Sequence, residues 1–350
     1  MSFFENTANQ GHESVHQFYD PKTGLKAIIA IHSTALGPAG GGCRMWQYES
    51  EAQATRDALR LSRGMTYKNA MAGLPMGGGK AVILANPDQP ASDELFHAFG
   101  RCVDSLGGRY VTAEDVGVSV DNMRLIKQVT EFVAGLPHAE GIAGGDPSPW
   151  TADGVFLGLA AAVKHRFGSD SLGNLRVAVQ GVGKVGYDLC RQLHAIGASL
   201  VIADVNEQNQ TRAQTEFGAQ VVDIDQILFE DVDVLAPCAM GAILDAQSIP
   251  NIRASVIGGA ANNQLASEAD GQRLFDRGIL YAPDYVINGG GIISVSMEYM
   301  GGKSESDVHA QIALIPERLT DIFVTSDKQQ TPTNVVADAM AESIVAAGRE

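Results

Sequence analysis

The residues best suited to chemistry are two lysines, Lys68 and Lys80, the second of which directly follows the run Gly77-Gly78-Gly79. Glycine lets a backbone come close to a small ligand because it carries no Cβ. In a half-buried pocket beside a second ammonium, a lysine has a lowered pKa, since burial and like charge both disfavour its charged form. Such a lysine is a base near pH 7. An isolated GGGK also fits a tight turn followed by a surface lysine.

A second pattern, Gly181-Val182-Gly183-Lys184-Val185-Gly186, follows the apolar run RVAVQ and opens a helical pattern. In this context the first glycine makes a turn, the second lets a pyrophosphate approach, and the third packs helix on strand. The helix N-terminus supplies amide donors to the phosphates. Asp204 ends the next predicted strand, where a carboxylate suits the ribose hydroxyls of NAD and repels the 2′-phosphate of NADP. The sequence therefore predicts NAD as the cofactor, with a purely structural turn as the alternative.

A third pattern, His12-Glu13-Ser14-Val15-His16, matches the HExxH motif of zinc proteases. That chemistry needs a stable helix, a third ligand and a cleft. The segment lies near the N-terminus among polar residues, with no identifiable third ligand. The four cysteines are far apart and form no CxxC pair. We therefore expect neither a metal site nor a disulfide framework.

Length and charge limit the classes of protein to which the chain can belong. The 350 residues suggest two domains at roughly 150 residues per domain. A net charge of −16 argues against nucleic acid or an anionic membrane as a partner. The N-terminal residues do not resemble a signal peptide, and the longest strongly apolar stretch, residues 155–163, is too short to span a bilayer. We expect a soluble cytoplasmic protein.

Hydrophobic periodicity predicts a mixed α/β chain. In the first third, the expected elements are a strand at 25–32, a glycine-rich turn at 37–42, a helix from Ser50 to Arg63, strands at 81–84 and 110–112, and a helix at 121–133. From residue 151 onward, helices alternate with strands, as is typical of a parallel sheet with helices on both faces. Those strands are expected at residues 177–180, 200–204, 232–236, 256–260 and 279–281. A late helix, around residues 308–322, contains Pro316 as a predicted kink.

The Gly/Pro-rich passage from Gly141 to Pro149 is a candidate hinge between two domains. We expect the first domain at residues 1–140 and a dinucleotide-binding domain at 141–329. The last helix, within residues 330–350, is expected to pack back on the first domain.

A series of motifs, in order along nearly the whole chain, resembles one enzyme family. They are LKAIIAIH, GPAGGGCRMW, RGMTYKNA, GGGKAVI, YVTAEDVG, GDPSPWTADGV, VAVQGVGKVG, APCAMGA, GAANNQL and YAPDYVINGGG. These motifs are similar to those of the Glu/Leu/Phe/Val dehydrogenases, and their residues are most similar to those of the leucine-specific members.

The resemblance implies two domains with a cleft between them: a catalytic and oligomerisation α/β domain, and a doubly wound Rossmann-type domain that binds NAD. It also implies reversible oxidative deamination of an L-amino acid to its 2-oxo acid and ammonium. By the same resemblance, Lys68 binds the substrate carboxylate, Lys80 is the base that activates the water attacking the imine, and Asp115 assists proton transfer. Two neighbouring lysines suit this division, because each disfavours the charge of the other.

The resemblance also assigns residues to the cofactor. Asn262 is implied to orient the substrate amine and the cofactor ribose, and Thr151 and Asn288 to lie near the nicotinamide. The loop Gly181–Gly186 and Asp204 complete the implied NAD site.

The family's substrate pocket corresponds here to Gly40, Gly41, Gly42, Met65, Ala113, Ile292 and Val295. Ala113 and Ile292 favour a branched aliphatic ligand, whereas Gly40, where a leucine enzyme should carry a bulkier residue, is expected to enlarge the pocket. An apolar pocket discriminates one methylene by only about 1–3 kcal/mol, so leucine, valine and isoleucine should all react. Leucine is the expected preferred substrate, with valine, or phenylalanine and other aromatic amino acids, as alternatives.

Two other functions stay open. A 2-hydroxy-acid dehydrogenase shares hydride chemistry with NAD but normally uses a cationic His/Arg apparatus, and ammonium-dependent oxidation of NADH distinguishes the two. A non-catalytic NAD-binding protein predicts cofactor binding without turnover. The resemblance also implies a homo-oligomer, either an octamer or a dimer.

Overall fold

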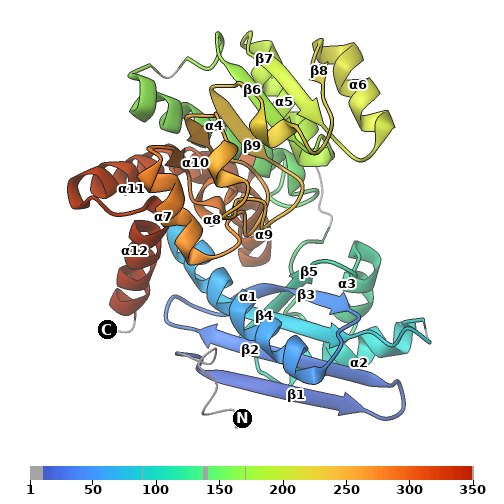
Figure 1. The fold of residues 1–350 in the computed structure, drawn as a ribbon. Helices are drawn as coiled ribbons and strands as arrows, with labels where there is room; N and C mark the ends of the chain where they lie inside the picture. Colours follow the sequence, from blue (N-terminus) through green and yellow to red (C-terminus); the bar gives the residue numbers. More distant parts are fainter. Residues whose placement is uncertain (1–10, 89, 137–140, 170, 349–350) are drawn as a thin grey trace. The chain divides into compact units, whose positions relative to one another are not determined.

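The computed structural model describes residues 11–88, 90–136, 141–169 and 171–348. The chain forms two compact units, each a sheet covered by helices (Figure 1), which confirms the predicted α/β class with two domains. The first unit takes in Met1–Asp146, Val295–Glu305 and Ala341–Glu350, and the second Pro147–Ser294 and Ser306–Met340. Among the described helices, none combines the length and apolar character needed to cross a membrane.

The first unit is built on a five-stranded sheet with strand order β1-β2-β4-β3-β5. Strand β2 is antiparallel to β1 and β4, whereas β3 runs parallel to both β4 and β5. The strands are β1 (Ser14–Asp20), β2 (Leu25–Ser33), β3 (Ala39–Trp46), β4 (Gly77–Leu84) and β5 (Tyr110–Glu114). The helices that cover them are α1 (Glu51–Met71), α2 (Asp93–Asp104) and α3 (Val120–Lys127).

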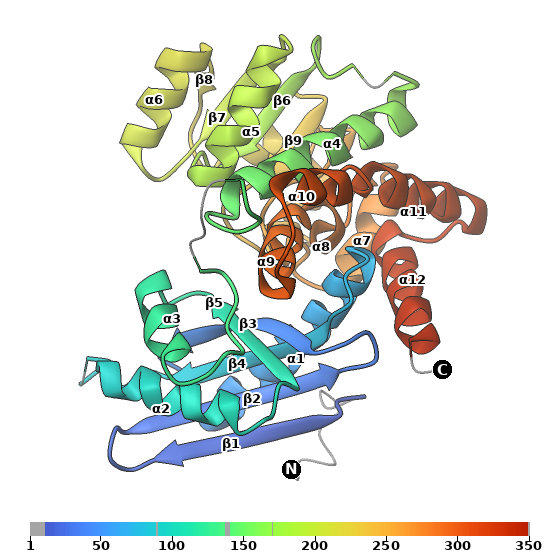
Figure 2. The ribbon, with the colours of Figure 1, turned by 180° about the vertical axis from the view of Figure 1, so that it is seen from behind.

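Helices bury both faces of this sheet. Ile29 of β2 belongs to one apolar cluster with Phe99 of α2 and Met123 of α3. Its neighbour Ile28 belongs to another cluster with Leu59 of α1. Successive side chains of a strand point to opposite faces, so a strand buried on both sides reads as a continuous apolar run. Figures 1 and 2, which view the unit from opposite sides, show α1 on one face and α2 and α3 on the other.

The second unit contains a six-stranded parallel sheet with order β11-β10-β9-β6-β7-β8. The strands are β6 (Arg176–Gln180), β7 (Ser199–Ala203), β8 (Gln220–Val221), β9 (Val234–Pro237), β10 (Val256–Ile257) and β11 (Leu280–Tyr281). The chain starts at β6 in the middle and later returns to its other side with β9. This reversal is the switch point at which doubly wound sheets bind ligands beyond the carboxyl ends of their strands.

The helices that follow the first unit's sheet are α4 (Ser148–Phe167), α5 (Lys184–Ala195), α6 (Glu207–Phe217), α7 (Glu268–Asp276), α8 (Asp284–Ile287), α9 (Gly290–Met300), α10 (Glu305–Ile312), α11 (Ile315–Gln329) and α12 (Thr333–Ala347). Gly158 permits the close packing of α4, because a Cβ there would lie 2.5 Å from Ile287 and 2.8 Å from Leu319.

Pro316 lies in the first turn of α11 and therefore starts a new helix, so the predicted kink is wrong.

Several predicted elements differ from the observed ones. The expected turn at residues 37–42 gives way to β3 at Ala39, and the expected helix at 121–133 ends at Lys127. Helix α1 begins as predicted after the N-cap Ser50, whose side chain accepts from the Gln53 amide, but it continues to Met71. The pattern analysis missed β1 and α2. The sequence of α2 nevertheless places Leu95, Phe99 and Val103 on one buried face at helical spacing, whereas β1 alternates half-buried and exposed residues only in its second half.

Candidate active site

The glycine run begins strand β4 rather than forming a turn. A Cβ at Gly77 would lie 1.9 Å from the carbonyl oxygen of Ser33, and one at Gly78 would lie 2.1 Å from the backbone nitrogen of Thr66. At Gly79 it would lie 2.7 Å from the Tyr110 ring. These glycines therefore allow a strand to pack tightly between its neighbours and α1. The idea that they make room for a ligand is wrong, because protein atoms already fill that space.

Lys80 follows the glycines and is 6% exposed. Its Nζ forms an ion pair and hydrogen bond with Oδ2 of Asp115, which lies directly after β5. Burial alone would raise the pKa of Asp115, but the Lys80 ammonium and the Arg44 guanidinium outweigh burial and hold that pKa below its usual value. The result is an ion pair between a buried ammonium and a half-buried carboxylate.

Lys68 lies in the last turn of α1 and is half-buried. The same end of the helix packs on β4, since Thr66 contacts the backbone at Gly78. The lysine-pair prediction considered only ammonium groups around Lys80. The structure adds a carboxylate, that of Asp115, in direct contact with Nζ of Lys80.

Gly42 of β3 borders this pair, and its neighbour Gly41 packs against Gly79 and Met65. A Cβ at Gly42 would lie 2.9 Å from the Cβ of Asp115, and one at Gly41 would lie 3.3 Å from the Cγ of Met65. Ala113 of β5 is half-buried and is the register partner of Gly42. The structure thus brings Gly41, Gly42, Met65 and Ala113 to the same end of the sheet as the Lys80–Asp115 pair.

Gly40 does not enlarge a pocket, contrary to the prediction. A Cβ at this position would lie 2.7 Å from the terminal methyl group of Met76 and 3.6 Å from Nδ2 of Asn69. Met76 is 4% exposed and already occupies the space that a larger residue 40 would take. The two remaining pocket residues, Ile292 and Val295, are half-buried three positions apart on one face of α9.

The three glycines of the loop after β6 have three different surroundings. Gly181 has φ +88°, a backbone conformation that favours glycine, and a Cβ at Gly186 would lie 1.9 Å from the carbonyl oxygen of Gly181. A Cβ at Gly183 would meet no protein atom within 4 Å. Packing therefore requires the first and third glycines, whereas the second leaves open space beside the first turn of the helix that follows.

The loop also offers donors to an anion. Gly183 is the N-cap of α5, which runs from Lys184 to Ala195, and no side chain caps its first turn. Uncapped amides and the helix dipole favour a bound phosphate there. Asp204 directly follows β7, beside the loop: its Oδ2 accepts from the Val182 amide at 2.7 Å, and its Oδ1 from the Asn206 amide at 2.8 Å. These residues fit a dinucleotide.

The other predicted cofactor residues also lie in the second unit. Nδ2 of Asn288 donates to Oδ1 of Asn262 at 2.8 Å, so these two side chains are brought together. Oγ1 of Thr151 donates to the carbonyl of Pro147 at 2.9 Å. A Cβ at Gly291 would lie 2.6 Å from that Oγ1, which shows the start of α9 packed on the start of α4. Asn288 is 2% exposed, and its Oδ1 has no hydrogen-bond partner within the described ranges.

Two family models match the chain. Residues 12–132 match the Glu/Leu/Phe/Val dehydrogenase, dimerisation domain, and residues 202–347 match the Glutamate/Leucine/Phenylalanine/Valine dehydrogenase model. The chain is 49% identical to leucine dehydrogenase of Geobacillus stearothermophilus over 98% of its own length and 93% of the relative's. The chain belongs to the Glu/Leu/Phe/Val dehydrogenase family. The predicted family is thereby confirmed.

Relatives with other names are nearly as similar. The crystal structure of L-tryptophan dehydrogenase from Nostoc punctiforme superposes with a TM-score of 0.88 at 45% identity, covering 99% of both chains. Valine dehydrogenase of Streptomyces albus is 46% identical over 97% of this chain and 93% of the relative. This dehydrogenase is therefore an oxidoreductase of amino acids with a Rossmann domain for a nicotinamide cofactor.

Sequence reasoning missed two charged residues of this dehydrogenase's site. Arg44 of β3 lies with its Nε 3.3 Å from Oδ2 of Asp115, and its Nη1 3.0 Å from Oδ2 of Asp57 on α1. Arg44 stands in the motif GPAGGGCRMW, but no spacing rule connects it with residues as distant as Asp115. Only the parallel pairing of β3 with β5 brings the two together.

The HExxH segment of this dehydrogenase does not form the helix that a zinc site needs. Residues from Ser14 onward belong to strand β1, and Nε2 of His12 lies 2.9 Å from Oγ of Ser62 and 3.1 Å from the carbonyl of Leu59. Across the described residues, no group of three or more His, Cys, Asp or Glu side chains is arranged to hold a metal.

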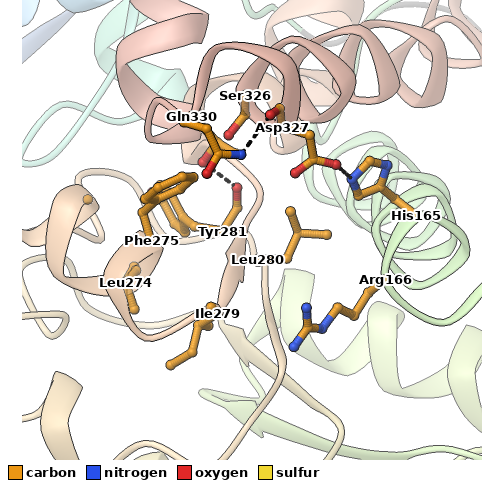
Figure 3. A pocket seen from close by; sticks show the side chains of 13 residues that line it. His165, Arg166, Leu274, Phe275, Ile279, Leu280, Tyr281, Ser326, Asp327 and Gln330 are labelled. Carbon is orange, nitrogen blue, oxygen red and sulfur yellow. Dashed lines mark hydrogen bonds and ion pairs between the residues drawn. The ribbon is translucent and has the colours of Figure 1, made fainter.

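A cavity of about 350 Å³ lies in the second unit beside the edge strand β11. Figure 3 shows apolar side chains such as Leu274 and Ile279 on one side, and on the other the pair of His165 and Asp327, whose Nε2 and Oδ2 are 2.9 Å apart. None of the residues predicted to bind substrate or cofactor in this dehydrogenase lines the cavity.

Proposed function

We propose that this protein catalyses the reversible, NAD-dependent oxidative deamination of L-leucine, and more slowly of valine and isoleucine, to the 2-oxo acid and ammonium. The observation that carries the proposal is the ion pair between the buried Lys80 and the half-buried Asp115, beside Gly42 of the first unit's sheet. A buried pair that can hold or release one proton is what deamination needs, since protons must leave the amine and the attacking water. The near-half identity to leucine dehydrogenase over the whole chain supports this choice.

The residues of the first unit bind the substrate and transfer its protons. The ammonium of Lys68 binds the substrate carboxylate by charge. The amine of Lys80, once its proton has passed to Asp115 or to solvent, takes the proton of the water that attacks the substrate imine. Asp115 holds Nζ of Lys80 in place and relays the proton to and from the substrate nitrogen. Met65, Ala113 and the β3 glycines exclude water from the reacting carbon.

The residues of the second unit would hold the cofactor. The amides of the Gly181–Gly186 loop would bind the pyrophosphate, Asp204 the adenosine ribose, and Asn262, Asn288 and Thr151 the nicotinamide half. When bound, NAD accepts the hydride from the substrate Cα.

Asp204→Ala is expected to weaken NAD binding by about tenfold or more and to relax the rejection of NADP. The carboxylate both accepts from the ribose hydroxyls and repels a 2′-phosphate, and the variant loses both effects. The measurement is kcat/KM for NAD and for NADP with leucine held constant. An unchanged ratio of the two would remove Asp204 from the cofactor site.

The preference for leucine is supported by the aliphatic residues Ala113, Ile292 and Val295 and by Met76, which fills the space beside Gly40. The relatives named for tryptophan and valine make aromatic amino acids and valine the alternative substrates. The cytoplasmic location and the homo-oligomer, octamer or dimer, stay predictions.

One assay tests the proposed function: reduction of NAD measured with a panel of L-amino acids, aliphatic and aromatic, and the reverse reaction with 2-oxo acids, with and without ammonium. We expect leucine to give the highest kcat/KM and the reverse reaction to require ammonium. NADH oxidation without ammonium would indicate a 2-hydroxy-acid dehydrogenase. Cofactor binding with no turnover of any substrate would indicate a binding protein.

A further inference from the structure

Arg44 connects the catalytic pair to a second carboxylate. Its Nη1 donates to Oδ2 of Asp57 at 3.0 Å, and its Nε lies 3.3 Å from Oδ2 of Asp115. The Nε contact is a charge contact rather than an aligned hydrogen bond, since Nε has no hydrogen-bond partner among the described residues. The hydrogen bond to Asp57 therefore fixes the orientation of the Arg44 guanidinium, and the guanidinium charge acts on the Asp115 carboxylate.

Asp57 is itself held firmly. Its Oδ2 also accepts from the Tyr48 hydroxyl at 2.7 Å, and its Oδ1 accepts from Nη2 of Arg60 at 3.1 Å. The side chains of Arg44, Asp57 and Asp115 are 24%, 17% and 22% exposed, so solvent screens their interactions less than those of surface pairs. Arg60, in contrast, is 58% exposed, so solvent screens its ion pair with Asp57 more strongly.

We propose that Arg44 is a positioning residue, which keeps the Asp115 carboxylate charged and directed at Lys80, and that Asp57 fixes the guanidinium in the orientation that this requires. The inference rests on the proposed function, because it concerns the proton relay of the same site. Arg44 acts through Asp115 and is not itself a catalytic residue. An arginine suits this role because its planar fork can contact two carboxylates at once and never loses its charge.

The charged and titratable groups around Asp115 agree with this role. Lys80 faces it from β4 and Arg44 from β3, and both favour the carboxylate. Burial raises the pKa of the Cys43 thiol on β3 and that of the Tyr110 phenol on β5 far above neutrality, so both neighbours are uncharged. Of the two cations, Lys80 must change its protonation during the reaction. Arg44 is then the cation whose charge stays constant through the cycle, and it favours the return of Asp115 to the ionised form after each proton transfer.

The test compares the pH profile of kcat for leucine deamination in Arg44→Met, Arg44→Lys and the native enzyme. The pKa of Asp115 is depressed, so activity that needs the carboxylate is present above that pKa and is lost as pH falls through it. Without the Arg44 charge the pKa of Asp115 rises. The acidic limb of the profile, which is the fall of kcat at low pH, should therefore move to higher pH by roughly one to three units in Arg44→Met. Arg44→Lys keeps the charge but cannot contact Asp57 and Asp115 at once, so it should shift the acidic limb by less.

Two further variants keep the test decisive. Asp57→Asn leaves Arg44 in place but weakens its orientation, and it should move the limb in the same direction by less, even if Arg44→Met does not fold. Arg124→Met removes an exposed arginine that pairs with Asp121 and should leave the profile unchanged. The affinity for NADH should be native in all variants.

An acidic limb that stays in place in folded Arg44→Met, or in Asp57→Asn, while the native enzyme turns over leucine, would overturn the role of Arg44 and leave the proposed function intact. A native enzyme that turns over no amino acid would instead overturn the proposed function. A lower Tm without a moved limb would show that Arg44 is purely structural.

Discussion

Replacing Lys80 by alanine is expected to lower kcat for leucine deamination by roughly 10²–10⁴-fold, which is the usual range for the loss of a general base. Lys80 is 6% exposed, so bulk water cannot readily replace its amine at the reacting atoms. The affinity for NADH should stay near the native value, because the glycine loop and Asp204 belong to the second unit. The measurements are the pre-steady-state rate of NAD reduction and the quenching of NADH fluorescence.

Two variants separate the basic role of Lys80 from its charge. Lys80→Arg keeps a cation beside Asp115 but cannot release a proton, so it should fold with a near-native Tm and be almost as inactive as Lys80→Ala. Lys127→Ala removes an exposed lysine of α3 and should have native activity. If Lys80→Arg retained most of the activity, charge alone would be needed. A parallel loss of NADH binding in Lys80→Ala would mean that the residue is misplaced in the mechanism.

The dinucleotide loop could be predicted from sequence because its determinants are local. The strand, the glycines, the helix and Asp204 lie within about thirty residues, and each glycine follows from a rule about turn, ligand approach or packing. The structure adds what no pattern could supply, namely that of the three glycines in this loop Gly183 alone faces open space. Such open space is what the approach of a pyrophosphate to the backbone would require.

The glycine run before Lys80 marks the site in the sequence, but its role in packing does not follow from the sequence alone. Its packing partners Ser33, Thr66 and Tyr110 come from three other elements, and no spacing along the chain indicates that they converge on β4. The same limit applies to Gly40, whose neighbour Met76 fills the space expected for a substrate. A glycine in a sequence shows that a Cβ is absent, whereas only the fold shows what takes its place.

Asp115→Asn is expected to reduce kcat by roughly 10²–10³-fold, with little change in the KM for leucine. Asparagine has the same shape and can still accept a hydrogen bond from Lys80, so the geometry of the site is preserved. It cannot take up the proton that the relay requires. The acidic limb that reflects ionisation of Asp115 should also disappear from the pH profile of the residual activity, because the variant has no carboxylate left to protonate at this position.

The matched control is Asp121→Asn, which removes an exposed carboxylate of the same unit and should leave both kcat and the profile native. Removing one partner of a buried ion pair typically costs about 3–5 kcal/mol of stability, so Asp115→Asn should also lower Tm. That loss alone does not identify a catalytic residue, because a structural ion pair shows it too. The combination with a missing acidic limb does, since only a group that titrates during turnover gives both. A folded Asp115→Asn enzyme with native kcat would leave Asp115 as the counter-ion of Lys80 and nothing more.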